Sequence, residues 1–281
     1  MLKFRLLAAA VLISVAFAIY VLGTLNQGHK PLTRSVERYV TAQNFPRIPR
    51  HFEDRLPADL ASWPVAARKR VFVDTVLPLV LQENEHLLAD RGRVMTLAAR
   101  QAQGRRLATA DKTWLAQLST RYRVTPGDLA ALLQRVDMVP PSLALAQAVE
   151  ESGWGTSRFA RDGNALFGQW TFTQGAGIVP LGREAGDFHE VKKYLALKHS
   201  VRDYVNNLNT HRAYTRLRRM RARFRAGEQT LSGYALSTAL IRYSARGEDY
   251  VRSLQSIIRV NELGRFDNAQ LGGQLVATLN Y

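Results

Sequence analysis

A short apolar run with clear ends constrains this chain more than any other segment. In SLALAQAVEESGWG, Ser142 can cap the start of a helix, and Gly153 can take the left-handed conformation that closes one. We therefore expect a helix over residues 143–152. Its last turn holds two adjacent acids, Glu150 and Glu151, and a cluster of glycine and tryptophan follows them.

The position of these two acids is electrostatically unfavourable. The C-terminal end of a helix carries roughly half a negative charge, and this charge, together with apolar neighbours, raises the pKa of a carboxyl group. An acid that keeps its proton near neutrality can act as the general acid in glycoside cleavage. Successive helix residues are about 100° apart, so only one of the two can face a cleft. Glu151 stacks over Ala144 and Ala148, whereas Glu150 stacks over Gln147. The competing interpretation is two solvated acids at a helix end.

The N-terminus predicts a membrane segment. Lys3 and Arg5 precede an uncharged apolar run over residues 6–25, about as long as the roughly 20 residues that span a bilayer as a helix. Residues 16–18 offer a small-residue cleavage site, but the apolar run continues beyond a typical signal-peptide core of about 7–15 residues. This favours an uncleaved anchor in the inner membrane, with a cleaved signal as the alternative. Positively charged residues that flank a membrane segment stay on the cytoplasmic side of the membrane. Both interpretations therefore place the rest of the chain in the periplasm.

Charge and composition restrict the classes of partner that the chain can bind. The 281 residues include 39 Lys and Arg against 23 Asp and Glu, a net charge of +16, which favours a polyanionic partner. A secretion signal argues against nucleic acid and leaves wall glycan or anionic lipid. The segment RLRRMRARFR, residues 216–225, is either a solvated helix face or a contact with such a partner. The chain has no cysteine, its six histidines lack metal-site spacing, and no phosphate-binding loop of the GxxxxGK type is present, so we expect no cofactor and no metal.

The distribution of helical and glycine-rich segments predicts a mainly α fold with a small β lobe. Residues 65–102 are expected to form two helices, or one helix kinked at Pro78, and residues 113–124 another. Thr125 and Pro126 are expected to start the next helix. Glycines punctuate short apolar pieces over residues 167–194, which indicates a β lobe. The expected organisation is a signal-anchor over 1–28, a linker and N-terminal helical region over 29–110, a catalytic domain over 111–265 and a weakly patterned tail over 266–281.

The run LAQAVEESGWGTSRFARDGNALFGQW resembles the core motif of glycoside hydrolase family 73, endo-β-N-acetylglucosaminidases that include the flagellar rod-cap hydrolase. It is similar also to the bacterial Bax-type proteins. VKKYLALKHSVRDYVNNLNTHRAY and LIRYSARGEDYVRSLQSII resemble later segments of the family, so the likeness covers about residues 139–263. It implies a lysozyme-like fold with a cleft between two lobes, and cleavage of β-1,4 bonds at N-acetylglucosamine in peptidoglycan. The activity implied is that of a glycoside hydrolase of the mannosyl-glycoprotein endo-β-N-acetylglucosaminidase type.

The resemblance also implies roles for single residues. Glu151 matches the acid that precedes Ser-Gly-Trp-Gly and donates the proton in the family, and Tyr243 matches the family's tyrosine. The second carboxylate of the β lobe has no firm counterpart: Glu184 and Glu190 are both candidates, with Asp187 third. If no carboxylate serves, the 2-acetamido group of the substrate can replace it as an internal nucleophile.

Further candidates concern sugar binding. Asn164 matches the first of the family's paired asparagines, but Ala165 stands where the second belongs. Four aromatic side chains are candidates to stack on sugar rings, with core packing as the competing interpretation: Trp154, Phe167, Trp170 and Tyr250. Two other functions stay open, a lytic transglycosylase that leaves an anhydro sugar end, and a wall-binding scaffold without activity.

Overall fold

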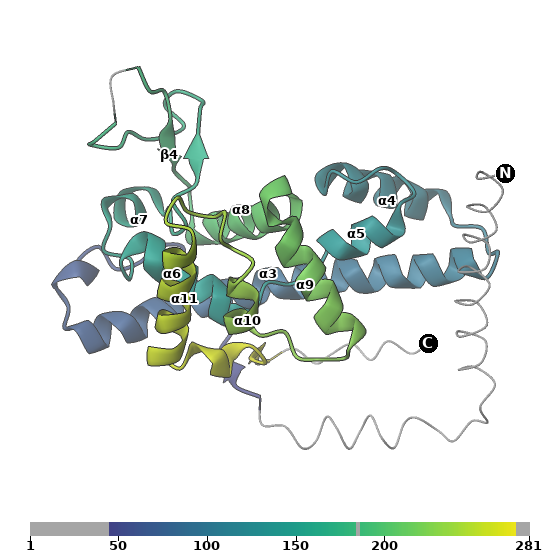
Figure 1. The fold of residues 1–281 in the computed structure, drawn as a ribbon, viewed down its shortest axis with the longest axis horizontal. Coiled ribbons are helices and arrows are strands. Elements are labelled where there is room, and N and C mark those ends of the chain that lie inside the picture. Colours follow the sequence, from purple (N-terminus) through teal and green to yellow (C-terminus); the bar gives the residue numbers. More distant parts are fainter. Residues whose placement is uncertain (1–44, 184–185, 274–281) are drawn as a thin grey trace. The chain divides into compact units, whose positions relative to one another are not determined.

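The computed structural model describes residues 45–183 and 186–273, which form helices and one small sheet lobe (Figure 1). The predicted mainly α fold with a β lobe is confirmed for these residues. The expected anchor over residues 6–25, with its alternative as a cleaved signal, lies outside them. Within the two described ranges, no helix combines the length and the apolar character that a membrane span requires.

The helices follow the predicted periodicity, with some shifts at their ends. The α-helices are α3 (Val65–Ala102), α4 (Thr109–Arg121), α5 (Leu129–Arg135), α6 (Pro141–Ser152), α7 (Arg158–Gly163), α8 (Leu197–Thr210), α9 (Thr215–Ala226), α10 (Gly233–Ser237) and α11 (Glu248–Val260). Short 3-10 helices are η1 (Leu60–Ser62), η2 (Arg212–Tyr214) and η3 (Leu263–Phe266). Helix α3 is continuous although Pro78 lies inside it, so the two-helix alternative is wrong.

The central helix is α6, which packs against α3, α10 and α11. Residues 141–149 of α6 are all buried, as expected for a helix that is apolar on nearly every side. Its predicted end is confirmed: Gly153 has φ 58° and ψ 48°, and its N–H donates to the carbonyl of Val149 at 2.9 Å. This end places the two acids of the last turn at the surface of the helical body.

The start of α6 is held from the far end of the chain. The predicted cap is wrong, because Ser142 lies inside the helix and Pro140 occupies the N-cap position. Asp267 supplies the missing acceptor: its Oδ1 accepts the Ser142 N–H, and its Oδ2 accepts the Ser142 hydroxyl and the Gly233 N–H, each at 2.9 Å. Within the expected tail, Phe266, Ala269 and Leu271 are therefore buried in the core, and Gln270–Leu271 (β5) pairs in parallel with Arg47–Ile48 (β1).

The start of α5 also differs from expectation. Thr125 does not cap it; the helix begins at Leu129, and the carboxylate of Asp128 accepts the N–H of Ala131 at 2.9 Å. Aspartate is as good an N-cap as threonine or better, and the sequence offered both.

The β lobe consists of three short strands, as predicted for residues 167–194. They are β2 (Trp170–Thr171), β3 (Gly177–Ile178) and β4 (Glu190–Lys192), in the antiparallel order β2-β4-β3. A Cβ on Gly177 would lie 2.4 Å from the carbonyl oxygen of Val191, so only glycine fits at this point of the sheet. Figure 1 shows the lobe, labelled β4, extending away from the helices.

The arginine-rich segment forms α9 and is only partly a solvated face. Arg216, Arg219 and Arg223 are exposed, but Arg218 and Arg221 are buried. The Arg218 guanidinium donates to the carbonyls of residues 208 and 211, each at 2.9 Å. Part of the positive charge of this segment therefore holds the fold together and does not face a partner.

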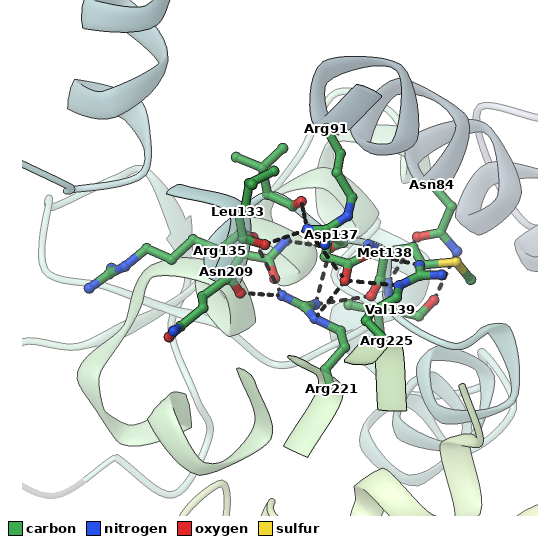
Figure 2. A network of polar contacts seen from close by, with 12 residues as sticks. Asn84, Arg91, Leu133, Arg135, Asp137, Met138, Val139, Asn209, Arg221 and Arg225 are labelled. Carbon is green, nitrogen blue, oxygen red and sulfur yellow. Dashed lines mark hydrogen bonds and ion pairs between the residues drawn. The ribbon is translucent and has the colours of Figure 1, made fainter. Parts of the chain in front are cut away.

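Arg221 belongs to a buried network around Asp137 (Figure 2). Its Nε lies 3.7 Å from Oδ2 of Asp137, and Arg225 donates to both carboxylate oxygens at 2.9 and 3.2 Å. Arg91 of α3 approaches the same carboxylate at 3.7 Å. Arg221 also donates to backbone carbonyls of the connection between α5 and α6, including Met138 at 2.9 Å. Helices α3 and α9 are thereby tied to the segment that leads into α6.

Candidate functional site

The turn below the two acids is built by the motif that follows them. Gly153, Trp154 and Gly155 all have positive φ, between 58° and 78°. Position 155 favours glycine because its φ is positive, and an added Cβ would also lie 2.4 Å from the Leu56 side chain and 3.1 Å from the Phe72 ring. The Ser152 hydroxyl accepts the Gly155 N–H at 2.9 Å and donates to the carbonyl at position 148. The serine, the glycines and the tryptophan thus fix the chain that leaves α6 directly after the acids.

A chain of hydrogen bonds from the core ends on Glu151. The buried Tyr204 donates to Oε1 of Gln147 at 2.7 Å, and Nε2 of Gln147 donates to the hydroxyl of Tyr250 at 3.0 Å. Tyr250 in turn donates to Oε1 of Glu151 at 2.8 Å. Because the tyrosine supplies the proton of that last bond, the acid's own proton belongs on Oε2. That oxygen lies on the side of Gly168, whose added Cβ would be 3.5 Å away.

The surroundings of Glu151 favour its protonated form. Burial raises the pKa of Glu151, since a carboxylate in an apolar environment loses its hydration. The hydrogen bond from Tyr250 lowers this pKa in part, and the charges of Glu150 and Arg246 act in opposite directions. The net direction is upward, as the position at the end of an apolar helix predicts.

Glu150 faces other partners than Glu151, as their angular separation predicts. One of its oxygens forms an ion pair with Arg246, and the other accepts the Ser253 hydroxyl at 2.6 Å. Glu150 therefore joins α6 to the segment around the start of α11, and its charge is compensated locally.

Three aromatic rings gather around the acid. Tyr243 stacks on Tyr250 at a centroid distance of 5.4 Å, and its hydroxyl donates to the carbonyl of Phe167 at 3.3 Å. Phe167 stacks on Tyr204 at 3.8 Å. Phe167 and Tyr250 are only 2% and 1% exposed, so their rings contact protein on all sides. Tyr243 is partly exposed and is the open ring of the three.

The other proposed sugar contacts lie in different environments. Asn164 is buried at the left-handed end of α7 and donates to the carbonyl of Tyr194 at 2.9 Å. Trp154 packs edge-on against Phe72, with the Lys69 ammonium 4.9 Å from its ring centre. Trp170, on β2, is 62% exposed and stacks with one face on the imidazole ring of His189 at 4.3 Å. Of the four proposed ring contacts, Trp170 is therefore exposed and Trp154 is partly exposed, whereas Phe167 and Tyr250 are buried.

The candidate second carboxylates differ in their accessibility. Glu190 is buried and accepts the N–H groups of Gly175 on Oε1 at 3.0 Å and of Gly177 on Oε2 at 2.8 Å. These backbone hydrogen bonds, the one from Gly175 first, lower the pKa of Glu190. Asp187 is exposed, with Oδ2 3.7 Å from the His189 ring. Glu184 lies outside the described residues. Glu190 thus uses both oxygens to hold its own lobe, whereas Asp187 is open.

Sequence reasoning missed the hydrogen-bond chain behind Glu151. Helical spacing places Gln147 on the face of Glu150, but it lies one helical turn before Glu151 as well, and through Tyr250 it supports that acid. A glutamine in the middle of an otherwise apolar helix is the signal that could have found it, because a fully buried amide needs partners. Among the described residues, no three acidic or histidine side chains cluster in a way that would hold a metal ion.

Comparisons with known proteins match this region. A family model described as "Mannosyl-glycoprotein endo-beta-N-acetylglucosaminidase" (Glucosaminidase) matches residues 127–263, which include α6, the β lobe and α11. Protein bax of Escherichia coli (strain K12) is 33% identical over 211 residues, which cover 73% of this chain and 74% of that protein. No solved structure matches the chain.

Proposed function

Because the chain belongs to the Bax-type, glucosaminidase-domain proteins, we propose that it hydrolyses β-1,4 glycosidic bonds at N-acetylglucosamine in peptidoglycan. The observation that carries this proposal is Glu151, a partly buried acid with a raised pKa, one oxygen held by Tyr250 and the other beside Gly168. We extend the proposal to a glycoside hydrolase family 73 enzyme with a lysozyme-like catalytic domain over residues 111–265. Attachment through residues 6–25 and a periplasmic location belong to the same proposal.

In the proposed mechanism, Glu151 protonates the leaving oxygen from Oε2 as the bond from that oxygen to the anomeric carbon breaks. The acid becomes a carboxylate at that moment. Tyr250 already donates to Oε1, so this hydrogen bond strengthens as the charge develops. Water then adds to the anomeric carbon. Its proton passes to a β-lobe carboxylate, or to the carboxylate of Glu151 where the substrate's 2-acetamido group has displaced the leaving oxygen, and hydrolysis is complete. The partly exposed Tyr243 ring, stacked on Tyr250, lies where it can orient the sugar.

The group that assists attack on the anomeric carbon is either a β-lobe carboxylate or the substrate's own 2-acetamido group. Glu190 is poorly suited, since the N–H groups of Gly175 and Gly177 occupy its oxygens. Asp187 has an exposed carboxylate and fits the role better, with Glu184 as the other candidate. The engagement of Glu190 also favours the second candidate function, a lytic transglycosylase, which needs a single carboxylate.

Digestion of purified sacculi tests the proposal. We expect soluble fragments that end in reducing N-acetylglucosamine, identified by mass spectrometry. Anhydromuramic ends would instead identify a lytic transglycosylase. If the sacculi stay intact after prolonged incubation with folded protein, the wall-binding scaffold is the remaining candidate function.

The role of Tyr250 gives a separate prediction. The Tyr250→Phe variant loses the donor to Glu151, so the pKa of Glu151 rises further and the carboxylate formed in the reaction is less stabilised. A hydrogen bond to a charged group contributes about 1.5–3 kcal/mol, so we expect kcat to fall at least about tenfold. The alkaline limb of the pH–rate profile should move to higher pH.

Tyr243→Phe is the matched control for this prediction. Its hydroxyl donates to the carbonyl of Phe167 and not to Glu151, so the alkaline limb should stay in place. An unchanged limb in Tyr250→Phe would contradict the proposed proton arrangement.

A further inference from the structure

A cavity lies between the N-terminal helices and α8. Its volume is about 630 Å³, within the range of about 300–1,000 Å³ that is usual for small-ligand sites. Helix α3 and the end of α4 form one wall, and α8 with the end of β4 forms the other. Nothing in the proposed mechanism uses this space.

Three ion pairs of Arg or Lys with an acid line the cavity, together with His86, which lies 3.9 Å from Glu83, and His199. Arg202 lies 3.4 Å from Glu83, Arg121 lies 4.0 Å from Asp90, and Lys192 lies 2.5 Å from Asp203. Three acids thus face three Arg or Lys side chains and two histidines, so the fixed charges of the cavity balance although the whole chain carries a net charge of +16. A cavity for a simple anion would show the excess of positive charge found elsewhere, so this balance points to a ligand with charges of both signs.

The positive and negative side chains of these pairs also differ in how deeply they are buried. The side chains of Arg121 and Arg202 are 65% and 58% exposed, whereas those of their acidic partners are 30% and 15% exposed. The cations therefore reach toward solvent at the edge of the cavity and the carboxylates lie deeper. The contacts of both arginines are at 3.4 Å or more, longer than good charge-assisted hydrogen bonds of about 2.7–2.9 Å. A ligand carboxylate can therefore compete for them.

Tyr194 connects the cavity with the proposed catalytic acid. It lines the cavity, and its hydroxyl lies 2.7 Å from the Gln169 side chain and 2.8 Å from Asp203. Gln169 directly follows Gly168, the residue beside Oε2 of Glu151. The cavity and Glu151 are thus linked through the consecutive residues Gly168 and Gln169.

We infer that this cavity binds the short peptide that branches from the peptidoglycan strand. The inference rests on the proposed function. The sugars of the strand carry no net charge, so the carboxylates and the free amine of the substrate belong to the peptide. Arg121 and Arg202 hold its carboxylates at the edge, and the acids behind them receive the amine. The chain then recognises the peptide as well as cleaving the glycan.

Titration of the full chain with a synthetic stem tripeptide that has free carboxylates and a free side-chain amine tests this inference. The Arg121→Ala/Arg202→Ala variant should bind it at least about tenfold more weakly, as the loss of one or more charge-assisted contacts implies. Acetylating the amine of the peptide should weaken binding to the unmodified chain by a similar factor. Equal binding by the variant, or no binding by the unmodified chain, would overturn the inference.

Arg216→Ala/Arg219→Ala is the matched control. It removes the same charge from the exposed face of α9 and should change the affinity less than about twofold, since these arginines do not line the cavity. If both double variants weaken binding equally, the peptide responds only to net charge and the cavity is not its site.

Digestion separates this inference from the proposed function. Sacculi with their peptides should be cut faster than strands stripped of peptide by an amidase, and Arg121→Ala/Arg202→Ala should abolish the difference. A chain that cuts both substrates equally and binds no peptide is a hydrolase without this subsite. A chain that binds the peptide through these arginines but cuts neither substrate keeps the subsite and refutes the hydrolase.

Discussion

Replacing Glu151 by glutamine is expected to lower the rate of glycan release by about 10²–10⁴-fold, the usual contribution of a general acid. Glutamine has the same shape, and its Oε1 can still accept the hydrogen bond from Tyr250. Its amide group would stand in place of Oε2 but cannot deliver a proton at neutral pH. Binding to sacculi should therefore persist while release stops, as a sedimentation assay and a soluble-sugar assay would measure in parallel.

The same variant should not destabilise the fold. Burial raises the pKa of Glu151 in the folded chain above its value in the unfolded chain, so the protonated form is favoured by folding. The stabilisation from this proton is complete below the unfolded pKa and is lost as the pH rises through the folded pKa. At neutral pH the variant, which mimics the protonated acid, should melt at the same temperature as the unmodified chain or higher. That advantage should vanish in acid.

Glu150→Gln is the control for position and charge. It breaks the ion pair with Arg246 but leaves the contact between Tyr250 and Glu151 in place, so glycan release should stay within a few-fold of the unmodified chain. If Glu151→Gln released glycan at the original rate, Glu151 would not be the acid. If Glu150→Gln were the inactive variant, the roles of the two acids would be reversed.

Local signals predicted the elements that depend on short stretches of sequence. The left-handed end at Gly153 and the β lobe over residues 167–194 follow from glycine chemistry. The separate environments of Glu150 and Glu151 follow from helix geometry. Each of these features depends on residues that are close together in the sequence. This is the range over which sequence patterns carry information.

Contacts between distant residues escaped prediction. The start of α6 is held by Asp267, which is 125 residues away from Ser142. Ser142 is not the cap because it lies inside the helix, where its own N–H and hydroxyl donate to Asp267. The arginine-rich segment has the pattern of a solvated face, yet Arg221 is 1% exposed. Its partner Asp137 is 84 residues earlier in the sequence, and no local pattern indicates a partner at that separation.

Asp137 is the residue whose loss should cost the most stability. Burial by itself raises the pKa of Asp137, but the charges of Arg221, Arg225 and Arg91 outweigh it and leave this pKa below its ordinary value. The carboxylate therefore contributes stability above the unfolded pKa of about 3.9, and this contribution is lost as the pH falls through the folded pKa. Asn209 and Arg221 both donate to the Asp137 carbonyl, at 3.0 and 3.1 Å, so backbone and side chain are held together (Figure 2).

We expect Asp137→Asn to lower the free energy of unfolding by about 3–5 kcal/mol, because it leaves the buried Arg221 guanidinium without its counter-charge. Chemical denaturation at neutral pH measures this, and the deficit should shrink in acid as Asp137 of the unmodified chain becomes protonated. Asp111→Asn is the matched control: that carboxylate pairs with the exposed Arg93 at 2.9 Å, so its loss should cost at most about 1 kcal/mol. Equal costs for the two variants would show that the buried network adds nothing beyond a surface pair. Because the network lies at the start of α6 and Glu151 at its end, the folded fraction of Asp137→Asn should still release glycan at the original rate.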